Sequence, residues 1–436
     1  MLDIKFIREN KDIVASGAKK KHIEVDIEKL ISLDDERLKE LKEVEELRSE
    51  VNRVSNDIAR DQDPQLKLQL IEEMRVVKED IKKKEEKLKQ TVEEWQKIML
   101  KIPNIPSVDT PEGDDDKGNQ VIRSFGEKRQ FSFTPKEHDV LGKALGLIDT
   151  ETAAEVAASR YSYLKGDLVL MQFALIQMCL EILTNEEILK KIAEETGVSV
   201  DIRKFTPVIP PVFIRPLVQV KMARFMTPEE HYIFPNDDLM LIGSAEHTMG
   251  SMHMNKIFEE KDLPIRYAGY STAFRREAGA AGKDTSGILR QHQFDKLEME
   301  VFSLPENSMQ EQNFLVAIQE YILNTLGLPY QVVMVCTGDM GFPDSRQIDI
   351  ETWMPGQNKY RETHSADSTG GFQSRRLNTR VRRADGKIEP VHMNDATVLA
   401  MGRALIAIME NYQQEDGSIA IPEVLRKYMG GREVIK

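Results

Sequence analysis

The sequence predicts an α+β protein with a long N-terminal helical hairpin and a larger C-terminal domain of mixed helices and strands. Two observations lead to this prediction: a heptad-like apolar pattern that fills the chain before residue 100, and alternating helix-like and strand-like segments after residue 134. A length of 436 residues allows two or three domains, at roughly 150 residues per domain. We expect an N-terminal domain over 1–105, a linker over 106–133 and a larger domain over 134–436.

The hairpin prediction rests on residues 27–100, which contain no glycine and one proline, Pro64. Apolar residues recur there at spacings of mostly three and four, in one stripe from Leu41 to Ile58 and another from Leu66 to Met99. The polar segment 59–63 before Pro64 indicates a turn between two antiparallel helices. Helices of about 30 residues would be about 45 Å long, so the tip is expected to project into solvent.

Two roles are open for such a hairpin on geometry alone. It could be an ordinary coiled coil for dimerisation or spacing, or an arm that contacts a partner. The basic tracts Lys19–Lys21 and Lys82–Lys84 fit either a solvated face or a local stripe that binds phosphates.

The remaining elements follow from composition. Three prolines and the acidic turn Gly113–Asp116 indicate the linker. We expect helices over 139–148, 168–183, 188–196 and 396–412, and strands over 240–242, 294–301, 330–335 and 348–353.

Composition also excludes several classes. Lys and Arg number 60 against 73 Asp and Glu, a net charge of −13, which argues against a general coat for nucleic acid. Two cysteines far apart exclude a disulfide scaffold and a cysteine-rich structural zinc site. The charged N-terminus is no signal peptide, and no apolar run reaches the roughly 20 residues of a membrane span, so we expect a cytoplasmic protein without a membrane partner.

Two polar stretches suggest a ligand. Ser244 and Glu246 follow a short apolar strand, and two residues that are two apart on a strand share a face, although a surface turn is the simpler interpretation. The second stretch begins at Arg275 and Arg276, continues through a Gly-rich loop that includes Lys283, and returns at Arg290. Arginines on a rigid strand next to a mobile loop suit a phosphate-bearing substrate, whereas a charged surface hairpin is the alternative.

Two further stretches carry isolated polar residues. Glu362 and Ser365 offer oxygen ligands of the kind that Mg²⁺ takes beside a nucleotide. Arg403 lies in the apolar segment expected to be a helix, where a buried arginine needs an anionic partner; an internal salt bridge explains it equally well.

Together these stretches resemble the seryl-tRNA synthetases of the bacterial type. The resemblance spans the chain in order and rests on Met1–Asn10, Lys165–Leu168, Arg275–Gly279, Arg290–Lys296, Cys336–Phe342, Trp353–Gln357, Phe372–Arg376 and Glu410–Gln414. It implies the class II synthetase fold, an antiparallel β-sheet flanked by helices, with an interface segment near Val208–Pro211 in a homodimer.

The resemblance also implies an activity and its partners. Such enzymes activate L-serine with ATP and Mg²⁺ to seryl-adenylate, and transfer serine to tRNA(Ser) and, where the host has it, to the selenocysteine tRNA. The N-terminal hairpin would hold the long variable arm of the tRNA.

Residue by residue, the resemblance implies the following roles. Arg275, Glu362 and Arg403 would be catalytic. The ATP site would comprise Arg275, Arg276, Glu277, Phe294, Glu362, Thr363, His364, Ser365 and Arg403, with Glu362 and Ser365 at Mg²⁺. The serine site would comprise Ser244, Ala245, Glu246, Arg275, Glu298 and Thr397. No structural zinc is expected.

The chain departs from the family pattern around the serine side chain. Ser244 stands where the family usually has Thr, Thr363–Gly370 replaces a Ser-rich stretch, and Asp395–Val398 replaces Asn-Gly-Ser-Gly. Two alternatives therefore accompany the enzyme hypothesis: an inactive homologue that binds RNA or regulates, and a free-standing enzyme that loads a carrier protein. Retention of Arg275, Glu362 and Arg403 argues against the first, and the long hairpin argues against the second.

Overall fold

The chain divides into two units, which we describe separately. A computed structural model describes residues 1–60, 63–224, 227–277 and 286–436. Contacts within the chain separate Met1–Ile105 from Pro106–Lys436. Part of the loop predicted from the glycine pattern, including Lys283, lies outside the described residues, as do two residues of the predicted hairpin turn.

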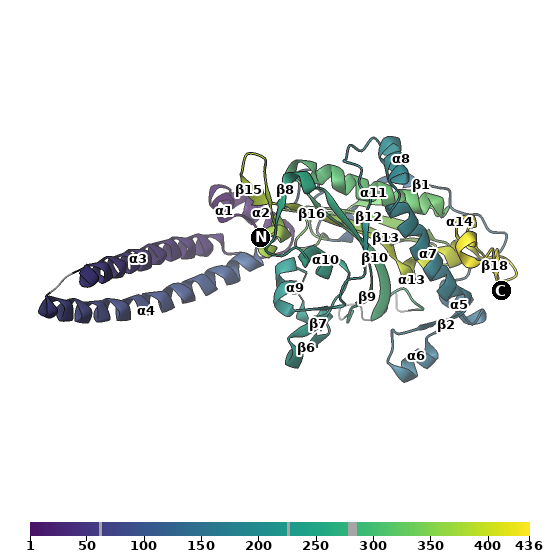
Figure 1. The fold of residues 1–436 in the computed structure, drawn as a ribbon. Helices are drawn as coiled ribbons and strands as arrows, with labels where there is room; N and C mark the ends of the chain where they lie inside the picture. Colours follow the sequence, from purple (N-terminus) through teal and green to yellow (C-terminus); the bar gives the residue numbers. More distant parts are fainter. Residues whose placement is uncertain (61–62, 225–226, 278–285) are drawn as a thin grey trace. The chain divides into compact units, whose positions relative to one another are not determined.

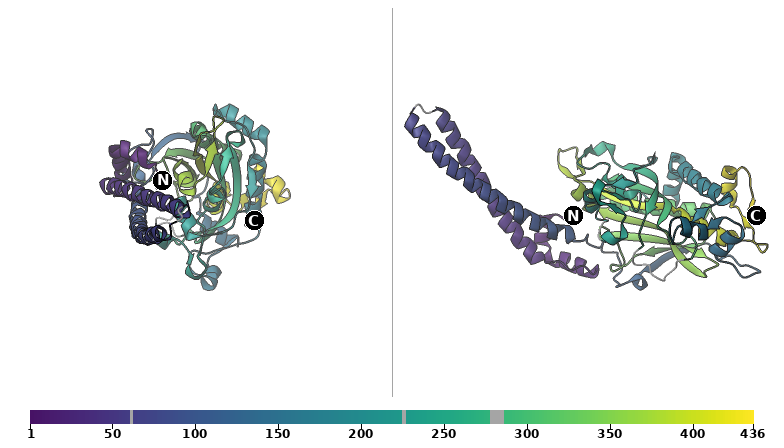
Figure 2. Two further views of the ribbon diagram at one scale, coloured as in Figure 1. Left: turned by 60° about the vertical axis from the view of Figure 1, so that its left-hand side comes forward. Right: turned by 90° about the horizontal axis from the view of Figure 1, so that it is seen from below.

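The first unit is the predicted helical hairpin. Its helices are α1 (Ile4–Glu9), α2 (Lys11–Lys20), α3 (Ile27–Arg60) and α4 (Pro64–Lys101). Helices α3 and α4 run side by side (Figures 1 and 2). The Asp63 side chain accepts a hydrogen bond from the Gln65 N–H and Pro64 occupies the first turn, so the sequence specifies where α4 begins.

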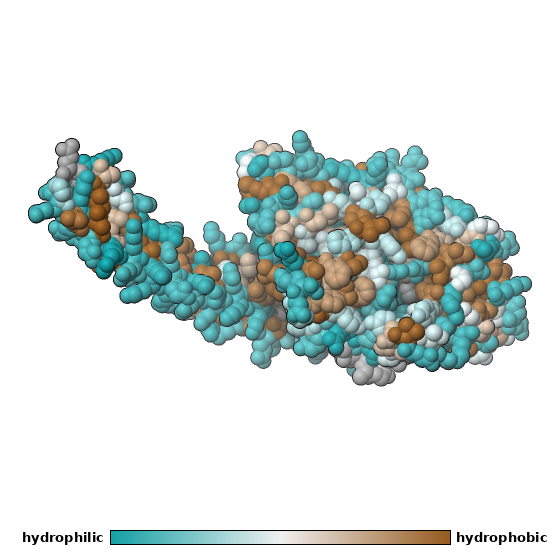
Figure 3. All heavy atoms as spheres, turned by 60° about the horizontal axis from the view of Figure 1, so that its bottom comes forward, coloured by the Kyte–Doolittle hydropathy of each residue, from teal (hydrophilic) through white to brown (hydrophobic). Residues whose placement is uncertain are grey.

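The two apolar stripes form the seam of the hairpin, as predicted. Val44 and Met99 are buried, and most stripe residues between them and the tip are half-buried, because two helices alone leave part of each seam open to water. The visible face of the hairpin is mainly hydrophilic (Figure 3). Lys84 pairs with Glu43 at 2.6 Å and Lys87 with Glu40 at 2.8 Å, so part of the Lys82–Lys89 tract is neutralised across the hairpin.

The second unit is built on a twisted sheet in the order β1-β11-β12-β13-β16-β10-β9-β4. Neighbouring strands are antiparallel except β4 and β9, which are parallel. The strands are β1 (Gln120–Phe125), β4 (Thr206–Val208), β9 (Ile265–Phe274), β10 (Gln293–Ser303), β11 (Tyr330–Met334), β12 (Arg346–Met354), β13 (Lys359–Gly370) and β16 (His392–Ala400).

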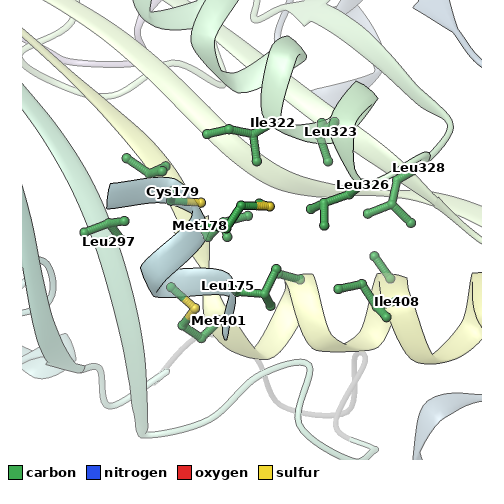
Figure 4. Packing of buried hydrophobic residues seen from close by; sticks show 14 of the residues in the cluster. Leu175, Met178, Cys179, Leu297, Ile322, Leu323, Leu326, Leu328, Met401 and Ile408 are labelled. Atoms are coloured by element: carbon green, nitrogen blue, oxygen red, sulfur yellow. The ribbon is translucent and has the colours of Figure 1, made fainter. Parts of the chain in front are cut away.

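One face of this sheet carries the main apolar core. The helices α7 (Asp167–Leu183), α8 (Glu186–Thr196), α11 (Ser308–Thr325) and α13 (Met401–Tyr412) contribute to it. Figure 4 shows Leu175, Met178 and Cys179 of α7 beside Leu297 of β10, Ile322 and Leu323 of α11, Leu326 and Leu328 after α11, and Met401 and Ile408 of α13. The opposite face of the central strands is polar, and it carries the site described below.

Shorter elements complete the unit. The helices are α5 (His138–Ala144), α6 (Glu151–Val156), α9 (Pro216–Met222), α10 (Glu246–Ser251), α12 (Phe372–Leu377) and α14 (Glu423–Arg426). The strands are β2 (Ile148–Asp149), β3 (Tyr163–Leu164), β5 (Phe213–Ile214), β6 (Ile233–Phe234), β7 (Leu239–Leu241), β8 (Ile257–Glu259), β14 (Arg380–Arg382), β15 (Ile388–Pro390), β17 (Ile419–Ala420) and β18 (Val434–Ile435). The 3₁₀ turns are η1 (Asp116–Gly118), η2 (Pro228–Glu230), η3 (Pro235–Asp237), η4 (Glu260–Asp262), η5 (Pro305–Asn307) and η6 (Lys427–Met429).

Three predicted elements differ from the structure. The helix predicted over 139–148 ends at Ala144, because Gly146 takes a left-handed conformation (φ +66°) and Ile148 starts β2. The helix predicted over 396–412 is wrong for 396–400, which complete strand β16. Strand β1 lies in the segment predicted to be a linker, where it pairs with β11.

Membrane helices are not evident in the described part of the chain. No single helix there is long and apolar enough to cross a bilayer. The pair α7 and α8, bent by 76° at the break between them, passes by length and composition only.

Candidate active site

The candidate site lies on the polar face of the central strands, where side chains alternate between core and cavity. On β10, Leu297, Met299 and Val301 enter the apolar core, whereas Lys296, Glu298 and Glu300 belong to the other face. Strands β16 and β13 follow the same rule except at the two bulges described below. The sheet therefore presents acidic and hydroxyl side chains on the face opposite to α7, α11 and α13.

A cavity of about 480 Å³ covers this face. Of the predicted site residues, it is lined by Glu246, Arg275, Glu277, Phe294, Glu362, Thr363, Ser365, Thr397 and Arg403. Ser244, Ala245, Arg276, His364 and Glu298 are not among the described residues that line it. Most of the residues predicted from distant parts of the sequence thus meet at one cavity.

A β-bulge in β13 brings Glu362 and Ser365 to the same side. The register between β12 and β13 shifts so that Glu362 faces Glu351 and His364 faces Ile350, which leaves Thr363 as an extra residue. In a regular strand, residues three apart would lie on opposite faces. The bulge lets Glu362, Thr363 and Ser365 all line the cavity, and His364 is buried instead, where burial lowers its pKa to about 4.

A second bulge positions Thr397. Between β10 and β16 the partners are Leu297 with Leu399 and then Glu298 with Thr397, so Val398 is the extra residue. Thr397 faces the cavity from this strand, whereas the predicted helix over 396–412 would have placed it on a helical turn.

Arg403 and Glu362 form a pair at one end of the cavity. The Arg403 Nη1 donates to the Glu362 carbonyl oxygen at 2.7 Å and lies 3.3 Å from its carboxylate Oε1. The Glu362 side chain is about half exposed. Partial desolvation at the cavity favours its neutral form, but the charges of Arg403, Arg275 and Lys296 together lower the pKa of its carboxyl group. Glu362 is therefore the anionic partner that the lone arginine of α13 required.

Arg275 follows the last residue of β9 and is fixed by two contacts. Its Nε donates to the carbonyl oxygen of Gly243 at 3.0 Å, and its guanidinium lies 5.4 Å from the centre of the Phe294 ring. Nearby, Arg290 pairs with Glu277 at 3.3 Å. Arg276 is exposed, with its guanidinium 5.8 Å from the centre of the Tyr232 ring.

Ser244 and Glu246 do not lie on a strand, so the prediction that they share a strand face is wrong. Strand β7 ends at Leu241, and Glu246 begins helix α10. Ser244 donates to Glu298 Oε1 at 2.9 Å, and Glu298 also pairs with Lys296. Glu246 instead lies 3.0 Å from Arg224 Nε.

Helix α10 can hold Glu246 there because it packs closely on β9. A side chain at Gly269 would overlap the Met249 sulfur of α10, so any larger residue there would have to displace the Met249 side chain. Burial lowers the pKa of the neighbouring His247 to about 3, so this histidine is neutral at physiological pH.

Arg224 is a cavity residue that the sequence reasoning did not find. Besides Glu246, its guanidinium approaches Asp344 and Asp367 at 3.2 Å and Asp395 at 3.3 Å. Asp344, Asp367 and Asp395 lie 120 to 171 residues away from Arg224 in sequence, so no local sequence pattern predicts the cluster. Asp395, which departs from the family pattern, was a partial signal of this cluster, because a buried carboxylate needs a cation nearby.

The four carboxylates share one guanidinium, and their pKa values respond in opposite directions. Burial and the charge of Asp344 raise the pKa of Asp367 to about 8, despite Arg224. Burial and Glu246 likewise raise the pKa of Asp395. Burial opposes ionisation of Glu246 too, but the charge of Arg224 lowers its pKa. The pKa of Glu246 is thus shifted downward, opposite to the pKa values of Asp367 and Asp395.

Comparison with protein families supports both units. Residues 1–106 match the model of the seryl-tRNA synthetase N-terminal domain, and residues 231–412 match the tRNA synthetase class II core domain (G, H, P, S and T). The chain is 40% identical over 430 residues to a serine–tRNA ligase of Symbiobacterium thermophilum, covering 98% of both chains.

Two solved structures resemble the whole chain. The seryl-tRNA synthetase of Pyrococcus horikoshii complexed with ATP is 36% identical with a TM-score of 0.86, and the comparison covers 100% of this chain and 99% of that one. The cytoplasmic serine–tRNA ligase of Naegleria fowleri in complex with AMP is 30% identical with a TM-score of 0.82, at the same coverage.

Proposed function

Because the chain belongs to the seryl-tRNA synthetases, we propose that it activates L-serine with ATP and transfers the seryl group to tRNA(Ser). Where the host has a selenocysteine tRNA, serine would be loaded on it as well. One observation carries the proposal: Arg275, Glu362, Arg403 and Glu246 come from four separate segments and line one cavity.

We assign ATP to the end of the cavity that holds Arg403. Arg275 would bind the α-phosphate and Arg403 the γ-phosphate, because guanidinium groups grip phosphate oxygens bidentately. Phe294 would stack on adenine and Glu277 would accept from its amino group; Arg275 above the Phe294 ring supports this neighbourhood. Thr363 would complete this end of the cavity, although its hydroxyl is bonded to Thr352 and to the Ile350 carbonyl oxygen. Arg276 and His364 remain proposed ATP contacts, although neither is among the described residues that line the cavity.

We assign serine to the other end, beyond Thr397. The ionised Glu246 would accept from the substrate ammonium group, and Thr397 offers a hydroxyl within the cavity. Ser244 and Glu298 are buried and hydrogen-bonded to each other, so they would brace this part of the site; Ala245 is buried as well. Arg275 would meet both substrates, since it contacts the Gly243 carbonyl oxygen, next to Ser244, as well as the Phe294 ring.

Glu362 and Ser365 would hold Mg²⁺ beside the phosphates. A carboxylate and a hydroxyl are oxygen donors of the type that magnesium accepts, with phosphates and water as its remaining ligands. The half-exposed Glu362 carboxylate is available at the cavity, which fits this role. When bound, the ion would supply neutralisation of phosphate charge.

The chemistry comprises two displacements. A serine carboxylate oxygen attacks the α-phosphorus, the bond to the bridging oxygen breaks, and pyrophosphate leaves. A ribose hydroxyl at the tRNA terminus then attacks the carbonyl carbon of the adenylate, and AMP leaves. Positioning and charge neutralisation by Arg275 and Arg403 carry both steps, since no side chain needs to form a covalent intermediate.

The other partners follow from the family and are proposals for this chain. The hairpin of α3 and α4 would hold the tRNA, and the protein would act as a cytoplasmic homodimer. The dimer is supported by apolar side chains that are exposed over 209–217, including Ile209 (85% exposed) and Leu217 (67%). Figure 3 shows apolar patches on one face of the second unit.

The test is pyrophosphate exchange into ATP, measured with each of the amino acids in turn. We expect exchange with serine well above every other amino acid. No exchange with serine, threonine, glycine or alanine would refute the enzyme hypothesis and favour an inactive homologue.

A further inference from the structure

Strand pairing on the polar face of the sheet fixes the order in which residues follow one another along the cavity. Ala400 is paired with Lys296, Thr397 with Glu298, and Asp395 with Glu300, in successive steps along β16 and β10. Asp367 is the partner of Asp395 on the adjacent strand β13. Arg403 follows Ala400 on α13, so Asp367 and Asp395 lie at the end of the cavity away from the proposed phosphates.

Arg224 closes that end. It follows Ala223, whose left-handed conformation (φ +59°) ends α9, and its guanidinium is only 15% exposed. It contacts carboxylates from four segments: α10, the loop after β11, β13 and β16. Glu246, Asp367 and Asp395 line the cavity beside it, and we call these three carboxyl groups with Arg224 the floor.

The floor is polar and borders the cavity. The Arg224 guanidinium can only donate hydrogen bonds, whereas the carboxyl oxygens of Glu246, Asp367 and Asp395, which lie 3.0 to 3.3 Å from it, can accept them. Such a surface offers both donors and acceptors to a ligand. A hydroxyl can donate and accept, a thiol does so weakly, and a methyl group does neither.

We propose that Arg224 is the residue that determines amino-acid specificity, because it fixes Glu246, Asp367 and Asp395 as a floor that fits a short side chain ending in a hydroxyl. This inference rests on the proposed function and adds to it a residue and a selection rule. Alanine would leave floor groups desolvated and unpaired, which is how a site built for a hydroxyl rejects the analogue without one. Arg224 acts through the carboxylates that it orients, so it is a positioning residue.

The test compares Arg224→Met with a matched control, Arg266→Met. Arg266 is also buried, and its guanidinium pairs with Glu311 at 2.8 Å, but it lies on β9 away from the cavity lining. Both changes remove a buried cation and keep much of the side-chain volume, but Arg224→Met leaves four carboxyl groups without their cation and Arg266→Met leaves one, so the melting temperature of each variant is measured beside its activity. Only Arg224→Met alters the floor.

The measurement is pyrophosphate exchange with serine, alanine, cysteine and threonine, with KM determined separately for serine and for ATP. For Arg224→Met we expect a higher KM for serine, a KM for ATP within about twofold of the unaltered protein, and a serine-to-alanine ratio of kcat/KM at least about tenfold lower. Arg266→Met should keep the ratio.

A triple variant keeps the inference testable if Arg224→Met does not fold. Arg224→Met combined with Asp344→Asn and Asp395→Asn removes two carboxylates together with the cation, so fewer charges are left buried without a partner. An unchanged serine-to-alanine ratio in both Arg224 variants would overturn the inference.

Failure of the proposed function gives a different result. If the unaltered protein shows no serine-dependent exchange, the proposed function fails, and the exchange with the other amino acids then tests the floor directly. Activation of threonine alone would keep the hydroxyl rule, whereas activation of alanine, or of no amino acid at all, would overturn the inference as well.

Discussion

At the scale of single residues, Arg403 is a partly buried charge whose ion pair opens onto the cavity. Its partner Glu362 lies on a different element, and both groups reach the cavity rather than ending in a closed internal pair. Half of the Glu362 side chain remains exposed. An ion pair that is open to a cavity can exchange its partner for a substrate group, which a fully enclosed pair cannot.

Replacing Arg403 with Gln tests its assignment to ATP. Loss of one charged donor to a transferring phosphate is expected to lower kcat/KM for ATP in pyrophosphate exchange by about 10²- to 10³-fold. The stability should change little, because Glu362 can be solvated from the cavity. Arg383→Gln, at a surface cluster of glutamates outside the cavity, is the control that should retain activity. Equal activities of the two variants would contradict the role of Arg403.

Asp367 predicts a pH dependence of stability. Its pKa is about 8 in the folded protein and about 3.9 in an unfolded chain, so the folded state holds a proton that the unfolded state has released. Its stabilising contribution is therefore fully present below about pH 4 and is lost as the pH rises towards 8. Asp344, Glu246, Asp395, Arg224 and the Ser365 hydroxyl surround it.

The measurement is the melting temperature of Asp367→Asn and of the unaltered protein from pH 5 to pH 9. Asn does not titrate, so the variant should lose less stability than the unaltered protein between pH 5 and pH 8. Asp262→Asn, at an exposed position of η4, controls for the loss of an aspartate. Parallel curves for Asp367→Asn and the unaltered protein would show that Asp367 is ionised throughout.

The sequence allowed some of these residues to be predicted and concealed others. Arg275, Glu362 and Arg403 stand in motifs whose order along the chain identifies the family. Arg224 stands in no such motif, and its partners gather from strands that only the folded sheet brings together. Electrostatic clusters of this kind depend on tertiary contacts and leave no periodic trace in sequence.

At the scale of elements, the apolar run over 396–412 shows the limit of periodicity. A strand in the centre of a sheet and a core helix are both apolar, so the boundary at Ala400 is invisible in composition. The bulges at Thr363 and Val398 are equally hidden, because one extra residue in a strand changes no residue type. In contrast, the hairpin helices were predictable, since their seam repeats over many turns.

The hairpin supports a prediction about tRNA. Deleting residues 51–80 and joining the ends with a short Gly-Ser turn removes the tip, but keeps the cross-hairpin pairs Arg48–Glu85 and Lys84–Glu43. Serine-dependent pyrophosphate exchange should stay within about twofold, because the cavity belongs to the second unit, whereas charging of tRNA(Ser) should fall by at least about tenfold. Full charging by the shortened protein would assign the hairpin a spacing role.

At the scale of the whole molecule, the proposed dimer predicts a mass. Each chain has a mass of 49.9 kDa, and sedimentation equilibrium should report about twice that value. Replacing Phe213 and Leu217 together with Glu should convert the protein to monomers, since both side chains are exposed and a buried charge in an interface is costly. The control is Val156→Glu on α6, at another exposed apolar position. A monomeric unaltered protein would refute the dimer.

The net charge of −13 describes the whole chain, whereas binding of RNA depends on the local charges of the hairpin. Part of the basic tract of the hairpin is already paired with Glu36, Glu40 and Glu43. Lys84 and Lys87 are therefore already engaged, and the acidic balance of the chain predicts weak binding to unrelated RNA and recognition of a tRNA by shape more than by charge.

The four-carboxylate environment of Arg224 also sets an order for combined substitutions. Removing Arg224 alone leaves four clustered carboxyl groups without their shared cation, whereas removing the aspartates first leaves Arg224 paired with Glu246. Variants that keep the aspartates but lack the arginine should therefore be the least stable of such a series.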